Sequence, residues 1–308
     1  MSKDSVRYGR VPKRSREKSE EPPQVTQSEP EKAKPAVSNL ELREQKMYET
    51  ITAVSDAHLS HCGYTVERTK NIVRKPAIFA MTEHQHNAVE GQVGAGSLEL
   101  QKIIMWQQFA SLLTPSIQQI VEFAKRIPGF QDLIQDDKLL CIKLGFFEIW
   151  LVHAARLINP MDGTITFNDG SYVSKNQLEV MFDREFVSLV FNFVCWFNDL
   201  QLNDIEIGLY CAVVLLTAER DGIYDHKAIQ MRQEKVIEAL KCLLNDNHPS
   251  EPHMFATLIS RLPELRILGE KHLDHLRWFR ANWVHINLAP LFAEVFDIPK
   301  SDLDLVQR

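Results

Sequence analysis

The chain has 308 residues, 44% of them hydrophobic, and a formal net charge of −6. This size allows one large core or two modest ones, and the acidic balance excludes a main body that coats nucleic acid. No run of 18 apolar residues lacks charge, which excludes a membrane span, and there is no secretory leader, so we expect a soluble intracellular protein.

The five cysteines form no CxxC pair, so no zinc module lies within these residues and no metal site is predicted. Their odd number and their scatter through apolar segments predict reduced, mostly buried thiols. They stand at Cys62, Cys141, Cys195, Cys211 and Cys242.

Residues 1–38 hold five of the 14 prolines and few large apolar side chains, so we expect a disordered linker. Seven of the first 18 residues are Lys or Arg, and such side chains suit DNA phosphates and narrow grooves. A solvated charge run or a nuclear-import signal has equal weight. The candidate DNA contacts are Arg7, Arg10, Lys13, Arg14 and Arg16.

A globular body is predicted from Asn39 onward, and its apolar periodicity is helical. Residues 64–96 are polar and irregular, which indicates a loose connection. Asn168-Asp-Gly predicts one hairpin within 163–172, and Pro115 predicts a kink or an early helical turn. The predicted helices span 40–59, 98–125, 136–157, 184–199, 203–218, 226–246 and 251–284. Because 136–157 is apolar nearly all round, we expect it to be covered on both sides. The fold class is therefore all-α, with three stacked helical layers and one small hairpin.

Two segments carry the functional signal. The stretch Phe123-Ala-Lys-Arg-Ile-Pro-Gly-Phe130 places Lys125 at the end of a long amphipathic helix. Far along the chain, Leu288-Ala-Pro-Leu-Phe-Ala-Glu-Val-Phe296 places Glu294 at the centre of an apolar segment. A basic and an acidic residue that flank an apolar groove can clamp the two ends of a short partner helix.

These segments, with Met105-Trp106, Ile117 to Ile127, Phe167 to Tyr172 and Leu216-Thr-Ala-Glu-Arg220, resemble a nuclear hormone receptor ligand-binding domain over residues 39–298. The register is most similar to the retinoid-related orphan receptors and their insect and nematode counterparts. The resemblance implies a three-layer antiparallel helical sandwich, followed by a flexible tail at 299–308. The first ten residues are similar to the segment that follows the second zinc module in these receptors. Residues 1–38 are then the basic extension of a DNA-binding domain plus a hinge, and the zinc modules are absent from this chain, as in a truncated isoform or fragment.

The resemblance implies a coactivator groove. Lys125 and Glu294 correspond to the basic and acidic clamps for an LxxLL helix, and Lys143 to a second basic contact. Lys138 stands where the family usually has glutamine. The apolar floor corresponds to Val121, Leu139, Ile142, Leu291 and Val295.

The resemblance also implies a ligand pocket. In sterol-binding relatives arginines occupy the positions of both His153 and Arg156, whereas here only the second is arginine. Larger aromatic side chains at other positions should shrink the cavity. Phe292 replaces a tyrosine that latches the terminal helix in some relatives. The pocket candidates are Trp106, Phe109, Leu112, Phe147, Trp150, His153, Arg156, Phe167 and His272.

The resemblance implies a nuclear, orphan-type transcription regulator, ligand-regulated or constitutively active, that recruits LxxLL coactivators and pairs with other nuclear receptors. A sterol-like lipid is the implied ligand class, and no cofactor is required. DNA binding is expected to be weak for this chain and strong only where a longer form carries zinc modules. No membrane contact is expected.

Two alternatives stay open. His272 matches an axial-ligand position in related heme-binding receptors, where a cysteine is the other ligand. Those receptors lack a usable activation helix, which this chain has, so heme is disfavoured. The other alternative is a helical adaptor that dimerises with receptors or sequesters coregulators. An enzyme is not expected, because the chain has no Gly-rich phosphate loop, nucleophile elbow or HExxH motif.

Overall fold

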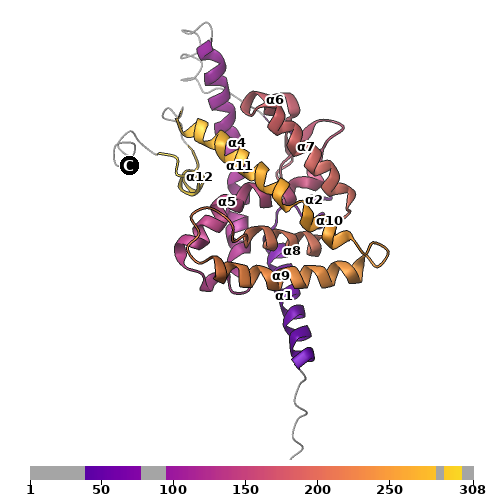
Figure 1. Ribbon diagram of the computed structural model, residues 1–308. Helices are drawn as coiled ribbons and strands as arrows, with labels where there is room; N and C mark the ends of the chain where they lie inside the picture. The colour runs from indigo at the N-terminus through magenta and orange to yellow at the C-terminus, as the bar shows by residue number, and fades with distance from the viewer. Residues whose placement is uncertain (1–38, 78–94, 282–287, 300–308) are drawn as a thin grey trace, which may run out of the picture. The chain divides into compact units, whose positions relative to one another are not determined.

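The computed structural model describes residues 39–77, 95–281 and 288–299, and these are mostly helical (Figure 1). The longer helices are α1 (Asn39–His61), α4 (Ala95–Arg126), α5 (Gln135–Ala154), α7 (Arg184–Asp199), α8 (Asp204–Leu215), α9 (His226–Asn247) and α11 (Leu262–Ala281). The shorter ones are α2 (Val66–Thr69), α6 (Lys175–Met181), α10 (Met254–Ser260) and α12 (Pro290–Val295), with 3-10 turns η1 (Phe130–Asp132) and η2 (Ala155–Leu157). The strands are β1 (Lys75–Pro76), β2 (Ile158–Asn159), β3 (Thr164–Thr166) and β4 (Ser171–Ser174). Within these described ranges, no helix is long and apolar enough to cross a bilayer.

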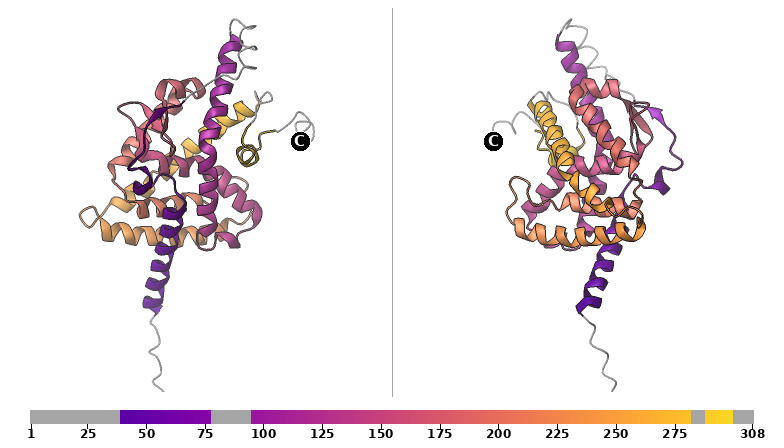
Figure 2. Two further views of the ribbon diagram at one scale, coloured as in Figure 1. Left: turned by 180° about the vertical axis from the view of Figure 1, so that it is seen from behind. Right: turned by 45° about the vertical axis from the view of Figure 1, so that its right-hand side comes forward.

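Helices α5 and α8 form the middle of the folded body (Figure 2). Every residue of α8 from Glu206 to Leu215 is buried, and so is every residue of α5 from Gly145 to Ala154. α5 packs against α4, α8 and α11, and α8 packs against α1, α5 and α9. A helix that is apolar all round needs neighbours on each side. The predicted all-α, three-layer fold is therefore confirmed, with α5 and α8 between outer helices.

The predicted hairpin is also confirmed, as strands β3 and β4. It belongs to a four-stranded sheet of order β1-β4-β3-β2, in which β1 pairs with β4 in parallel. Gly170 at the hairpin turn has φ 86°, and a Cβ there would lie 2.2 Å from the carbonyl oxygen of Val73. Glycine is thus required both for the turn and for the approach of the segment that leads into β1.

The helix predicted over 98–125 is confirmed as α4, which contains Pro115. Three other helical features differ from the sequence-based expectation. The short helix α2 lies in the segment 64–96, which was expected to be an irregular connection. The helix expected over 251–284 is instead α10 and α11, which are separated at Arg261. Pro263 explains this break, because proline cannot donate the backbone hydrogen bond of a helix interior but is tolerated in a first turn. The short helix α6 was not predicted, although Ser174 and Gln177 form a capping box at its start.

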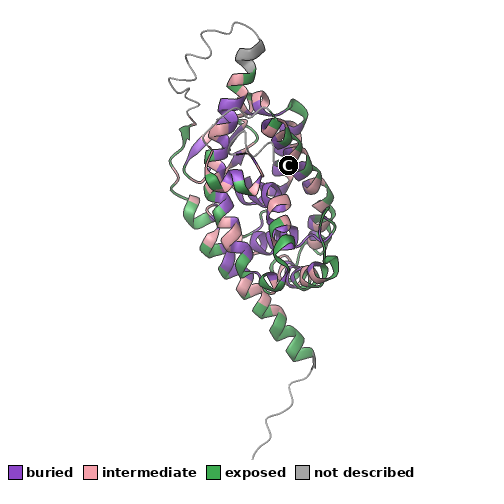
Figure 3. Ribbon diagram, turned by 90° about the vertical axis from the view of Figure 1, so that its left-hand side faces the viewer, coloured by how far each residue is buried: buried purple, intermediate pink, exposed green. Residues whose placement is uncertain are grey.

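Buried polar groups connect the helices away from α12. Arg220 and Glu148 form a two-fold ion pair, with Nη1–Oε1 2.7 Å and Nη2–Oε2 2.9 Å. Asp137 accepts hydrogen bonds from the amides of Tyr224 and Asp225, and so fixes the start of α9 to α5. By contrast, the first half of α1 is largely exposed (Figure 3).

Candidate functional site

The two clamp residues lie on helices that pack against each other, α4 and α12 (Figure 1). Lys125 is in the last turn of α4, and Glu294 is in the last turn of α12. Both residues are exposed. Each charge is therefore accessible to a partner.

The predicted floor of the groove consists of apolar side chains that differ in exposure. Leu139 is 56% exposed, which is unusual for a leucine in a helix of the core. Val121, Leu291 and Val295 are half-buried, and Ile142 is buried. Exposed apolar area of this kind favours contact with another apolar surface.

The two lysines assigned to the predicted groove have different partners. The Nζ of Lys125 lies 2.8 Å from Glu122 Oε1, one turn back on α4. Such exposed pairs contribute little and exchange easily. Lys143 on α5 is less exposed and pairs with Asp297, just after α12. This second pair joins the end of α12 to α5.

Apolar packing holds the inner face of α12. Phe292, Phe296 and Ile298 are buried, whereas Glu294 on the same segment faces outward. The Phe296 ring lies edge-on to Phe146 at 5.5 Å and to His272 at 6.2 Å between ring centroids. The ring of this segment that contacts His272 is thus that of Phe296, whereas the sequence analysis placed Phe292 at the latch position, and Phe292 packs on Phe296 at 4.8 Å between centroids.

Six of the nine predicted pocket residues form one aromatic cluster. Trp106 stacks on Phe279 at 5.4 Å between centroids, and Phe109 meets both Phe167 and Trp150 edge-on. The aromatic cluster consists of Trp106, Phe109, Phe147, Trp150, Phe167 and His272, extended by Phe182, Phe186 and Phe279. All its members are buried.

These rings occupy the space beside them. The cavity lined by Phe109, Phe147 and Trp150, together with residues of β3, α6 and α7, holds only about 10 Å³. A drug-sized or sterol-sized ligand needs roughly 300–1,000 Å³. Leu112, a predicted pocket residue outside the aromatic cluster, is half-buried.

His272 is the unusual member of the cluster. It is fully buried, and neither ring nitrogen has a hydrogen-bond partner within the described part of the chain. Burial lowers the pKa of this imidazole to about 3, so it is neutral at physiological pH. An unpartnered neutral imidazole is chemically a metal ligand. However, Phe147 stacks on the ring at 4.2 Å, and the other rings in contact with it are Trp106, Phe182 and Phe296. This packed arrangement does not fit a porphyrin.

His153 and Arg156 lie apart from the aromatic cluster. His153 contacts the rings of His58 and Phe123, at 5.0 and 6.2 Å between centroids. The Nη2 of Arg156 lies 2.6 Å from Asp204 Oδ1 on α8. The polar partner that this guanidinium requires is thus a carboxylate of the same chain.

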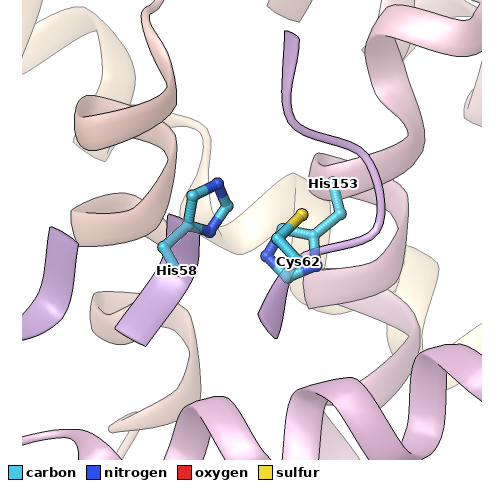
Figure 4. A group of neighbouring side chains, drawn as sticks. All are labelled: His58, Cys62 and His153. Atoms are coloured by element: carbon cyan, nitrogen blue, oxygen red, sulfur yellow. The ribbon is translucent and has the colours of Figure 1, made fainter. Parts of the chain in front are cut away.

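Sequence reasoning missed the cluster of His58, Cys62 and His153, in which the histidine ring nitrogens and the sulfur come within 4.8 Å of one another (Figure 4). The i,i+4 spacing of His58 and Cys62 was a usable signal, because such residues share a helix face. Nothing in the sequence indicated that His153 would join them. The predicted DNA contacts, Arg7 to Arg16, lie outside the described residues.

The chain is similar in sequence to one protein family and to several known proteins. A family model described as the ligand-binding domain of nuclear hormone receptor matches residues 95–282. The chain is 46% identical over 265 residues to ecdysone-induced protein 78C of Drosophila melanogaster, covering 85% of this chain and 30% of that protein. It is 39% identical over 178 residues to nuclear receptor subfamily 1 group D member 2 of Rattus norvegicus, covering 58% of this chain and 31% of that protein. The chain therefore spans about a third of the length of these relatives.

Proposed function

This chain belongs to the nuclear hormone receptor family, whose members are transcription factors rather than enzymes, and on that premise we propose that it recruits LxxLL coactivators without requiring a ligand. The observation that carries the proposal is the state of α12. Its inner face is packed by buried Phe292 and Phe296, while Glu294 is exposed on its outer face. A terminal helix held by the protein's own side chains needs no ligand to hold it.

The groove offers complementary charges to a partner helix. The exposed amides at the N-terminus of an LxxLL helix suit the carboxylate of Glu294, and its C-terminal carbonyls suit Lys125. The leucines of the motif would contact the exposed Leu139 and the half-buried Val121 and Leu291. Lys143 acts on the groove through its ion pair with Asp297, which holds the end of α12.

Peptide titration by fluorescence anisotropy tests the groove. Glu294→Ala and Lys125→Ala should each weaken binding of an LxxLL peptide about 10- to 100-fold, because each removes a charge-assisted contact of roughly 1.5–3 kcal/mol. Unfolding by urea should change little, since both side chains are exposed. Lys235→Ala on α9 is the matched surface control. Wild-type affinity in both groove variants would refute the assignment.

A heme- or gas-sensing receptor is the second candidate, supported by the two unpartnered nitrogens of His272. It requires the aromatic cluster to open, because Phe147 covers the ring. An absorption spectrum of the purified chain after addition of hemin distinguishes the two candidates. A Soret band that is lost in His272→Phe would support heme, and its absence in the unmodified chain would exclude it.

The nuclear location and the pairing with other receptors belong to the same proposal, and they follow from the family. DNA contact by Arg7, Arg10, Lys13, Arg14 and Arg16 is likewise proposed, with weak affinity and steep salt dependence for these residues alone.

A further inference from the structure

Two of the buried imidazoles and one buried thiol converge between α1 and α5 (Figure 4). His58 and Cys62 are successive on one face at the end of α1, and the amide of Cys62 still donates to the carbonyl of His58 at 2.8 Å. His153 enters from the last turn of α5. Within the residues that the structure describes, these are the one trio of His, Cys, Asp and Glu side chains close enough to share a metal ion.

One ring nitrogen of each histidine in this trio lacks a hydrogen-bond partner among the described residues. His58 Nδ1 and His153 Nε2 are both buried without a hydrogen bond. The Cys62 sulfur accepts one hydrogen bond, from the amide of Tyr64 at 3.3 Å, which leaves its other lone pairs for a metal ion. Buried polar atoms are normally satisfied, so two orphaned imidazole nitrogens beside a thiol indicate a missing ligand.

The backbone of α8 lies close to His58. A Cβ on Gly208 would lie 2.7 Å from the Cβ of His58, so glycine on α8 is what lets this histidine fit between the helices. Val152 and Arg156, on either side of His153 in the chain, line a surface groove of about 500 Å³. His58 is thus closely packed against α8, and a surface groove runs along residues that flank His153 in the chain.

We propose that His58, Cys62 and His153 form a buried binding site for one thiophilic d¹⁰ metal ion, Cu⁺ in preference to Zn²⁺. Bonds of about 2.0 Å to nitrogen and 2.3 Å to sulfur place such ligand atoms roughly 3.5–3.7 Å apart. The present separations of up to 4.8 Å close to that value with small side-chain rotations. A thiolate with two imidazoles is a donor set that copper and zinc both accept.

Charge balance selects the monovalent ion. One thiolate with Cu⁺ is neutral, whereas one thiolate with Zn²⁺ leaves a positive charge in a buried site. The nearest carboxylate, Asp204, is already paired with Arg156 and accepts the amide of Val66 at 3.0 Å. Arg68, which donates to the carbonyl of Cys62 at 3.0 Å, adds a further positive charge nearby.

Binding requires the thiol to lose its proton. Burial raises the pKa of Cys62 to about 12, so without metal the side chain is a neutral thiol. On binding, the sulfur forms a bond to the metal and the proton passes to solvent. The imidazoles give up no proton, because burial lowers the pKa of His58 to about 4 and that of His153 well below its usual value.

The test is a titration of the tag-free, reduced chain with Cu⁺ against a chromophoric Cu⁺ chelator, and with Zn²⁺ against a zinc dye. Cys195→Ser and Cys242→Ser in all variants remove the more accessible thiols. We expect one equivalent of Cu⁺ and an X-ray absorption spectrum with one sulfur and two imidazole neighbours. Cys62→Ser and His153→Gln should each weaken retention at least about 10-fold. His61→Gln, in the same turn of α1 but outside the trio, is the matched control and should bind as the parent does.

The site would be overturned if the chain with only Cys195→Ser and Cys242→Ser did not bind one equivalent of Cu⁺, or if adding Cys62→Ser left Cu⁺ binding unchanged. Retention of Zn²⁺ in preference to Cu⁺ would overturn the charge argument. The X-ray absorption spectrum is recorded on the chain with only Cys195→Ser and Cys242→Ser, so the ligand set can be tested even where a further substitution unfolds the chain.

Discussion

Adjacent residues of α5 face two differently built regions. Glu148 enters the ion-pair region, where its carboxylate receives both Nη atoms of Arg220 and each side chain is only 4% exposed. Phe147 enters the aromatic cluster, where it stacks on a histidine that has no hydrogen bond among the described residues. One helix thus serves a region held by directional charged contacts and a region held by ring packing.

The two regions tolerate change differently. In the ion-pair region the guanidinium also donates to the carbonyls of Leu144 and Val214, both at 3.1 Å, so its geometry is specified from several sides. A Cβ on Gly269 would lie 2.6 Å from Glu148 Oε1, so even the backbone of α11 is fitted to the carboxylate. Ring contacts are less directional, and an aromatic core can repack or accept an apolar guest. We therefore expect the aromatic cluster to accept substitutions and apolar ligands, and the region around Arg220 to accept neither.

The largest effect should come from breaking the ion pair. Arg220→Met leaves the Glu148 carboxylate buried without its counter-ion, which should cost about 3–5 kcal/mol in the free energy of unfolding. Urea denaturation measures this loss. Arg43→Met is the control, because both side chains of its pair with Glu238 are exposed, and that pair should be worth less than about 1 kcal/mol.

A double variant sharpens this first prediction. Glu148→Leu with Arg220→Met removes both charges, and it should be more stable than Arg220→Met alone. If the double variant were as unstable as the single one, packing rather than charge would explain the loss.

The second effect should come from opening the aromatic cluster. Phe147→Ala removes the ring stacked on His272 and enlarges a cavity of about 10 Å³. The expected cost is about 3–4 kcal/mol if the neighbours do not collapse. A small apolar ligand such as benzene should then raise the thermal midpoint of the variant and leave the unmodified chain unchanged, since it binds only the folded, enlarged site. Equal shifts in both proteins would show that the cavity was already open. No ligand should rescue Arg220→Met, which is the contrast between the regions.

The sequence was sufficient for features that depend on local patterns. The continuous apolar run of α5 predicted a central helix, and Asn168-Asp-Gly predicted the hairpin. Lys125 and Glu294 were chosen from short motifs, and both lie exposed on helices in mutual contact.

The features that could not be predicted depend on pairing across the chain. Glu148 and Arg220 are 72 residues apart, and the sequence around either residue does not indicate that the other is its partner. Strand β1 has only two residues and exists because β4 supplies a partner, so no periodicity marks it. Arg156 was expected near a ligand because its guanidinium needs a polar group, but Asp204 supplies that group. A need for a partner is local information, whereas the identity of the partner is not.

The smallest effect should be on the pH dependence of stability, and it again separates the regions. The folded chain holds His272 neutral because burial lowers its pKa to about 3, and protonation of the neighbouring His275 would lower it further. The unfolded chain binds a proton at this histidine near pH 6.5. Stability is therefore fully present above pH 6.5 and is lost as the pH falls toward 3, by about 1.4 kcal/mol at pH 5.5 for this one group. His272→Phe should remove that share of the loss between pH 7.5 and 5.5 in urea denaturation, whereas His253→Gln, at an exposed position, should not. An unchanged slope in His272→Phe would mean that the imidazole gains a proton or a partner in the folded state, and the cluster would then be a polar site rather than a packed one.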